Sequence, residues 1–152
     1  MKIVIAGGGT SGWITAAALS NQMGENLDIT LVESQEIGTI GVGEATIPPM
    51  RTFHRLLGIN EQEFMKATNA TFKLGIQFEN WKKIGEKYFH SFGGTGKQTL
   101  ITDFIHFWLR GRELGVADEF GNYCLEYKAA LEERFSINDN AKINYAFHLD
   151  AG

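Results

Sequence analysis

Three glycines near the amino terminus have the spacing of a phosphate-binding turn. Gly7, Gly9 and Gly12 form the pattern G-x-G-x-x-G directly after a short apolar run. In such a turn the first glycine permits a tight bend, the second lets the backbone approach a pyrophosphate, and the third lets the next helix pack closely. Thr10 and Ser11 are small, and their hydroxyls can donate further hydrogen bonds. The turn therefore predicts a dinucleotide site at a helix N-terminus, whose amides and partial positive charge face phosphates.

An acidic residue follows at the distance that such a site requires. Glu33 comes 21 residues after Gly12, at the end of a second apolar run. A carboxylate there accepts hydrogen bonds from ribose hydroxyls, which favours NAD or the adenosine half of FAD over the 2′-phosphate of NADP. The alternative is a strand-to-helix turn that needs glycine for steric reasons alone, with Glu33 simply solvated.

A second glycine-rich segment, residues 41–48, reads GVGEATIP and is not required by a plain nucleotide-binding fold. Its glycines allow a ligand to approach the backbone closely, and its consecutive N–H groups could form an anion-binding nest. The alternative is an ordinary surface loop.

One lysine lies within a strand pattern. In residues 72–78 apolar and polar side chains alternate, and this predicts a strand with Lys73 on the face opposite Phe72. An ammonium group facing an internal channel can donate a hydrogen bond to a small electrophile and orient it. Burial would lower its pKa and favour the reactive amine. The alternative is a solvated lysine on the polar side of an edge strand.

The elements that must position these residues follow from hydrophobic periodicity. An apolar strand, a helix and a second strand that ends on an acid predict a β–α–β unit, and the first strand is of the buried parallel type. The fold class is α/β: a Rossmann-like FAD/NAD(P)-binding fold, incomplete, with added strands and helices. We expect strands over 2–6, 28–33, 72–78, 87–92 and 143–149, and helices over 10–22, 50–57, 60–68, 99–114 and 122–134.

Composition excludes several classes of protein. With 14 basic and 18 acidic side chains the net charge is −4, which argues against a nucleic-acid binder. The single cysteine, Cys124, excludes an internal disulfide and lacks a nucleophile motif. Four dispersed histidines predict no metal site. We expect a cytoplasmic protein without membrane contact, because no apolar run reaches the length of about 18 residues that a spanning helix needs.

The segments GGGTSGW, GVGEATIP and FKLGIQFENW, in this order and at this spacing, resemble the N-terminal part of the FAD-dependent tryptophan halogenases over essentially all 152 residues. The resemblance implies that the adenosine diphosphate half of FAD is held by Gly7, Gly9, Thr10, Ser11, Gly12 and Glu33. It implies that a mobile loop lies along the flavin and links the flavin and substrate sites, formed by Val42, Gly43, Glu44 and Ala45. Lys73 matches the catalytic lysine of that family.

The chemistry implied by the resemblance uses reduced FAD (FADH2), oxygen and a halide to form hypohalous acid. That acid would travel through a tunnel to Lys73, beside tryptophan or a related indole. A separate flavin reductase would supply the reduced cofactor. Residues 1–152 would then be the N-terminal FAD-binding part of a longer flavoprotein, with the substrate-binding C-terminal part absent.

The chain also departs from the family pattern. The family's W-x-W-x-I-P motif, which blocks monooxygenase chemistry, is absent, and Trp81 and Trp108 do not supply it. The acid partnered with the lysine is absent as well. We expect the 152-residue chain alone to be inactive. An FAD-dependent monooxygenase-type flavoprotein and a truncated nucleotide-binding module without activity are the alternatives.

Overall fold

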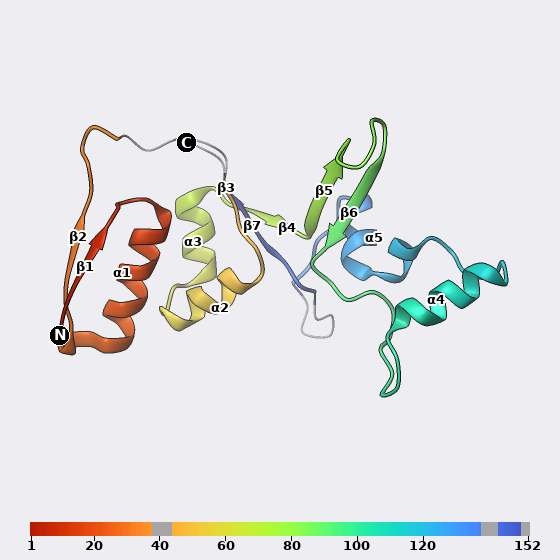
Figure 1. The fold of residues 1–152 in the computed structure, drawn as a ribbon, viewed down its shortest axis with the longest axis horizontal. Helices are drawn as coiled ribbons and strands as arrows, with labels where there is room; N and C mark the ends of the chain where they lie inside the picture. The colour runs from red at the N-terminus through yellow and green to blue at the C-terminus, as the bar shows by residue number, and fades with distance from the viewer. Residues whose placement is uncertain (38–43, 138–142, 150–152) are drawn as a thin grey trace. The chain divides into compact units, whose positions relative to one another are not determined.

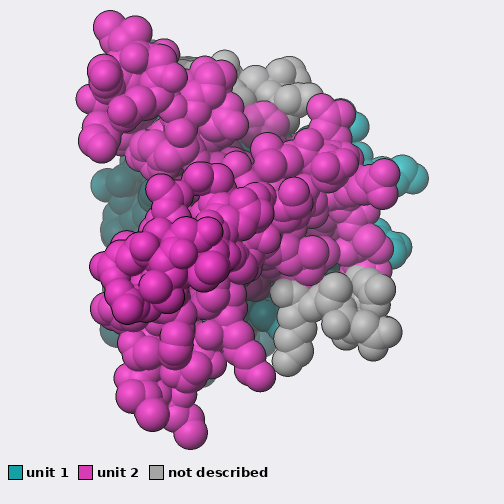
Figure 2. Space-filling view, turned by 90° about the vertical axis from the view of Figure 1, so that its right-hand side faces the viewer, with its two compact units in different colours: residues 1–44, 49–70, 149–152 teal, residues 45–48, 71–148 magenta. Residues whose placement is uncertain are grey.

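A computed structural model of the protein describes residues 1–37, 44–137 and 143–149. The chain divides into two compact units, which Figure 2 shows in different colours. Unit 1 takes residues 1–44, 49–70 and 149–152, and unit 2 takes residues 45–48 and 71–148.

Unit 1 contains the predicted β–α–β unit, with two helices added after it. Its two strands pair in parallel, from Lys2 opposite Asp28 to Ala6 opposite Val32, and the first helix packs along them (Figure 1). The two later helices confirm the short helices predicted around residues 50–57 and 60–68. The elements are β1 (Lys2–Ala6), α1 (Thr10–Met23), the 3-10 helix η1 (Gly24–Asn26), β2 (Asp28–Val32), α2 (Pro49–Leu56) and α3 (Glu61–Thr68).

Strand β1 is less buried than its apolar sequence predicts. Ile5 faces α1, since its Cγ2 lies near Gly12, and it is half-buried. Val4 points to the opposite face and is 69% exposed. One helix can cover only one face of this two-stranded sheet, whereas a fully buried parallel strand needs cover on both. Within the described residues the expectation of a buried strand is therefore wrong.

Unit 2 combines two small sheets with helices. A three-stranded sheet has the order β3-β7-β4, and a hairpin joins β5 to β6. Lys73 in β4 stands opposite Ala146 in β7. The chain passes from unit 1 to unit 2 within β3. The elements are β3 (Glu44–Ala45), β4 (Thr71–Lys73), β5 (Gly75–Glu79), β6 (Lys87–Ser91), α4 (Phe104–Glu113), η2 (Phe120–Tyr123), α5 (Leu125–Leu131) and β7 (Ala146–Leu149).

The single strand predicted over residues 72–78 is two strands in two different sheets. β4 ends at Lys73 and β5 begins at Gly75, so Leu74 is the point where the chain changes sheet. Leu74 is buried, and its carbonyl accepts a hydrogen bond from the N–H of Phe92 (2.9 Å). Apolar and polar side chains continue to alternate through such a junction because alternation depends only on the extended backbone. It does not depend on which strand is the hydrogen-bonded partner. The prediction of one continuous strand was therefore wrong.

The helix predicted over residues 99–114 begins five residues later, at Phe104. The hydroxyl of Thr99 accepts hydrogen bonds from the N–H groups of Ile101 and Thr102 and donates to the carbonyl of Thr102, which closes a turn. A threonine side chain that competes for backbone groups in this way favours a turn over a helix. Leu100 and Ile101 consequently lie exposed in the turn and not on an apolar helix face. The helix predicted over 122–134 is likewise shorter, and a 3-10 turn precedes it.

The core of unit 2 lies around β7. Phe147 is fully buried, and Cys124 and Tyr145 are nearly so. The ring of Phe72 stacks on Phe135 with centroids 3.9 Å apart, and Tyr145 meets both rings edge-on. Such aromatic packing rigidifies the strand pair β4–β7 on the face away from Lys73.

Candidate functional site

The glycine turn of unit 1 has the conformation and the close packing that only glycines permit. Gly7 has φ +119°, which side chains rarely adopt, and its N–H donates to the carbonyl of Val32 (2.8 Å). A Cβ on Gly12 would overlap the carbonyl oxygen of Gly7. The first and third glycines are therefore needed by the turn itself.

The second glycine leaves space beside the start of α1. A Cβ built on Gly9 would meet no atom within 4 Å. Gly9 is the N-cap of α1, and neither a side-chain cap nor an acidic side chain in the first turn occupies that end of the helix. The first amides of Thr10 and Ser11 are thus left uncapped by side chains of α1 itself, and a helix N-terminus carries a partial positive charge that attracts anionic groups.

Glu33 lies against the same turn, although it is exposed. A Cβ on Gly8 would overlap the Glu33 side chain, so the carboxylate crosses the turn at the point where the chain has no side chain. The G-x-G-x-x-G pattern assigns no role to Gly8. Its place within the triple glycine was the available signal.

The second glycine-rich segment is described only in part. Val42 and Gly43 lie outside the described residues. Glu44 approaches the glycine turn, where its carboxylate accepts a hydrogen bond from the hydroxyl of Thr10 (3.3 Å). Unit 1 therefore brings Glu33, Glu44 and the predicted turn residues together. Ala45 is the first residue of unit 2.

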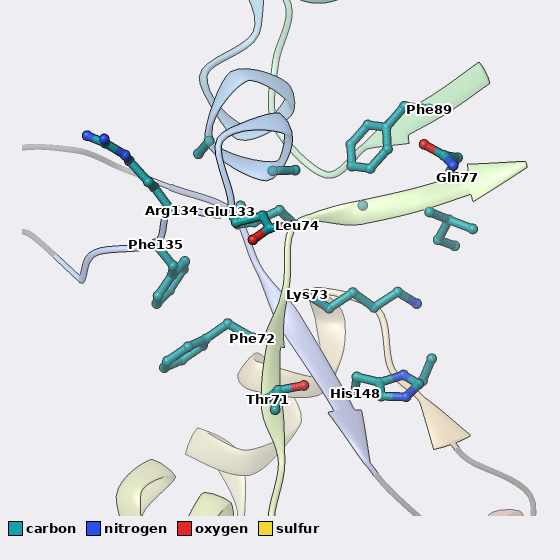
Figure 3. A pocket seen from close by; sticks show the side chains of 15 residues that line it. Thr71, Phe72, Lys73, Leu74, Gln77, Phe89, Glu133, Arg134, Phe135 and His148 are labelled. Atoms are coloured by element: carbon teal, nitrogen blue, oxygen red, sulfur yellow. The ribbon is translucent and has the colours of Figure 1, made fainter. Parts of the chain in front are cut away.

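Lys73 and Phe72 leave strand β4 on opposite sides (Figure 3). Although β4 is an edge strand of its sheet, Lys73 is half-buried. Its Nζ donates a hydrogen bond to the carbonyl of Thr46 (3.2 Å) and lies 5.4 Å from the centre of the Phe92 ring. Burial lowers the pKa of Lys73, because the charged ammonium loses solvation there.

Lys73 lines an open cleft of about 690 Å³ that belongs entirely to unit 2. Aromatic side chains and polar groups share its walls, and Ala45 and His148 are among the residues that line it. Ala45 and Lys73 are thus the predicted residues that unit 2 brings together. A volume of this size is in the range of small-molecule sites.

Two residues that contact the Lys73 ammonium were not predicted. Thr46 belongs to the GVGEATIP segment, and that membership was a usable signal. Phe92 directly follows β6, and nothing in the sequence connects it to Lys73. Both contacts join segments that are far apart along the chain.

The part of the chain that the structure describes contains neither a candidate metal site nor a membrane-spanning helix. In residues 1–37, 44–137 and 143–149, no group of three or more His, Cys, Asp or Glu side chains could hold a metal ion. Within the same ranges, every helix is too short or too polar to cross a bilayer.

The sequence profile of the family described as "Tryptophan halogenase" matches residues 2–152. The chain is 50% identical over 126 residues to tryptophan 6-halogenase SttH of Streptomyces toxytricini, covering 81% of this chain and 23% of SttH. It is 37% identical over 168 residues to tryptophan 7-halogenase RebH of Lentzea aerocolonigenes, covering 99% of this chain and 32% of RebH.

A solved structure is similar as well. Xcc4156, a flavin-dependent halogenase from Xanthomonas campestris, is 60% identical with a TM-score of 0.90, covering 99% of this chain and 31% of that one. The fold is thus the mixed α/β, Rossmann-like fold of flavin-dependent halogenases. The chain spans less than a third of the length of each of these relatives.

Proposed function

Since the chain belongs to the tryptophan halogenase family, we propose that it forms the N-terminal, FAD-binding part of an enzyme that halogenates tryptophan or a related indole. The observation that carries this proposal is the position of Lys73. Lys73 is half-buried and lines the cleft, and its side chain leaves β4 on the side opposite Phe72, where its ammonium contacts Thr46 and Phe92. An ammonium in that setting can orient a small electrophile beside an aromatic substrate.

The residues of unit 1 fit the adenosine diphosphate half of FAD. The space beside Gly9 and the uncapped start of α1 can receive the pyrophosphate. The hydroxyl of Ser11 can add a hydrogen bond, and that of Thr10 can do so by exchanging its partner Glu44 for the phosphate. Glu33 would accept hydrogen bonds from the ribose hydroxyls. Glu44 and Ala45, with Val42 and Gly43, would form the loop along the flavin.

When bound, the reduced flavin would supply with oxygen the oxidising equivalents that convert a halide ion to hypohalous acid. The Lys73 ammonium would then hold that acid by donating a hydrogen bond to its oxygen. As the halogen bonds to the indole carbon, the ring loses a proton, and the oxygen leaves as water. The role of Lys73 is to orient the electrophile and to stabilise the negative charge that develops on the departing oxygen.

The same proposal includes three partners: tryptophan or an indole, a halide, and a separate flavin reductase that delivers reduced FAD. We place this chemistry in the cytoplasm and assign activity to the full-length protein. The 152-residue chain would bind nucleotide without completing a turnover.

The experiment is Lys73→Ala in the full-length protein, assayed for halogenation of tryptophan and of free indole. We expect product formation to fall about 10²–10³-fold, as when a charge-stabilising donor is removed from an active site. FAD binding, read from flavin absorbance after gel filtration, should be retained. The control is Lys82→Ala, because Lys82 is an exposed lysine in the β5–β6 hairpin.

Undiminished product from Lys73→Ala would remove the proposed role of the lysine. Hydroxylated product in place of halogenated product from the unchanged protein would favour the monooxygenase alternative. Refolding the chain with FAD tests the cofactor separately, and absence of binding would argue for a turn shaped by steric needs alone.

A further inference from the structure

Thr46 is fixed to the core of unit 2 by three hydrogen bonds to one residue. Its backbone N–H donates to the carbonyl of Phe147 (2.8 Å). Its hydroxyl accepts from the N–H of Phe147 (2.8 Å) and donates to the carbonyl of Phe147 (3.1 Å). A hydroxyl can fill both of these roles at once, whereas a methyl group can fill neither. Because Phe147 is fully buried, the N–H and the hydroxyl of Thr46 are held against a buried strand.

The carbonyl of Thr46 accepts the hydrogen bond from Lys73 Nζ (3.2 Å). Lys73 is itself placed by β7, because it stands opposite Ala146, the residue before Phe147. Both ends of the contact between Lys73 Nζ and the Thr46 carbonyl are therefore tied to the same buried strand. A lysine side chain on its own would sample many rotamers, and this arrangement selects one.

We propose that Thr46 is a positioning residue for Lys73: its hydroxyl holds its own carbonyl oxygen where that oxygen orients the lysine ammonium. This proposal rests on the proposed function, in which the Lys73 ammonium orients a small electrophile. One N–H of the ammonium is directed to Thr46, and the other two can donate to a small electrophile beside Lys73. Fixing the donor before the substrate arrives lowers the entropic cost of the reactive geometry.

The first measurement reports the contact without using activity. The full-length protein is treated with a limiting amine-reactive reagent, N-hydroxysuccinimidyl acetate, and modification of Lys73 is followed by peptide mass spectrometry. In Thr46→Val we expect Lys73 to be modified about 3- to 10-fold faster than in the unchanged protein, because loss of the Thr46 hydroxyl displaces the carbonyl that accepts the hydrogen bond from the ammonium. In Thr46→Ser the hydroxyl is restored, and the rate should return to that of the unchanged protein.

The second measurement reports the consequence for turnover. With FAD, a flavin reductase, halide and tryptophan supplied, Thr46→Val should lower kcat about 10- to 100-fold, the range expected when a reacting group is misplaced. The KM for tryptophan should change less than about twofold, because the substrate's binding contacts are kept. Thr46→Ser should recover most of kcat. General loosening of the fold would instead raise KM together with the loss of kcat.

The matched control is Thr68→Val. The hydroxyl of Thr68 also donates to a backbone carbonyl, that of Phe64 (2.8 Å), but it lies in α3 of unit 1. Modification of Lys73 in this variant should match that in the unchanged protein. If Thr46→Val does not fold, Thr46→Ala, which also lacks the hydroxyl, takes its place with the same expectation. Unchanged modification of Lys73 in that variant overturns the proposal, and faster modification supports it.

An unchanged rate of Lys73 modification in folded Thr46→Val would show that the Thr46 hydroxyl does not hold the lysine, and this would overturn the proposal. If Lys73 were modified faster in Thr46→Val but kcat stayed unchanged, Thr46 would contact the lysine without positioning it for the reaction, and this would also overturn the proposal. Full activity of Lys73→Ala would instead overturn the proposed function, and the modification rates would still report whether Thr46 holds the lysine. The two failures are therefore distinguishable.

Discussion

The two units achieve their sites by different means. In the described part of unit 1 only Ala70 and the polar His54 are buried, and Trp13 on α1 is 56% exposed. In unit 2 the residues around Phe147 form a closed core. The glycine turn is nevertheless well defined in unit 1, because backbone geometry and local contacts shape it. The surroundings of Lys73 depend on packing between segments that are distant along the chain. A glycine turn thus needs little core, whereas an oriented lysine needs a rigid one.

The largest expected effect is a difference between the two units in how much free energy of unfolding is lost when an aromatic side chain is removed. Phe147→Ala removes a fully buried ring and should cost about 3–5 kcal/mol, whereas Trp13→Ala should cost about half as much or less, because more than half of that side chain is already exposed. Amide hydrogen exchange of the 152-residue chain, resolved by mass spectrometry, measures both. Phe147→Ala should accelerate exchange in β4 and β7. Comparable losses from the two variants would contradict the contrast between the units.

A smaller effect separates the two roles of glycine within unit 1. Gly12→Ala places a methyl group against the backbone carbonyl of Gly7, so we expect a loss of about 1–3 kcal/mol from forced backbone shifts together with weakened FAD binding. Gly9→Ala meets only open space and should lower FAD affinity with little loss of stability.

Fluorescence titration with FAD and thermal unfolding without it provide the two readouts. If Gly9→Ala bound FAD as well as the unchanged chain does, the pyrophosphate would not approach the backbone at this position.

The smallest effect is the dependence of stability on pH. Burial lowers the pKa of His54 in unit 1, opposed by the charge of Glu61, and burial lowers the pKa of Lys73 in unit 2. A lowered pKa means that the unfolded state binds more protons between the folded pKa and the ordinary value, so stability rises with pH across that interval. For His54 the interval lies below pH 6.5, and for Lys73 it lies below pH 10.5.

Unit 1 should therefore lose stability as the pH falls below 6.5, and unit 2 should gain stability as the pH approaches 10.5. Urea midpoints of the unchanged chain and of Lys73→Met, compared at pH 7 and pH 10, test the second statement. At pH 7 we expect Lys73→Met to unfold at a higher urea concentration than the unchanged chain, because methionine carries no buried charge. The difference between the two urea midpoints should be smaller at pH 10. A larger difference at pH 10 would contradict the predicted direction of the pKa shift. NMR titration of His54 tests the first statement.

Much of the fold was predictable from local patterns. The β–α–β unit and the helices α2 and α3 were predicted because hydrophobic periodicity and turn residues act within a few positions. Asn60 illustrates this, since its side chain accepts from the N–H groups of Gln62 and Glu63 and so starts α3. The change of sheet at Leu74 was not predictable, because the choice of strand partner depends on residues that lie far along the chain.

The sequence by itself determined the glycine turn and the acid after β2, because the steric needs of Gly7 and Gly12 and the spacing to Glu33 are properties of one short segment. It also determined that Lys73 and Phe72 point to opposite faces, since side chains alternate along a strand. Only the tertiary structure decided what surrounds the Lys73 ammonium. Thr46, Phe92 and Phe147 come from three separate segments, and the hydrogen bonds and burial that orient and desolvate this lysine exist only once those segments have packed together.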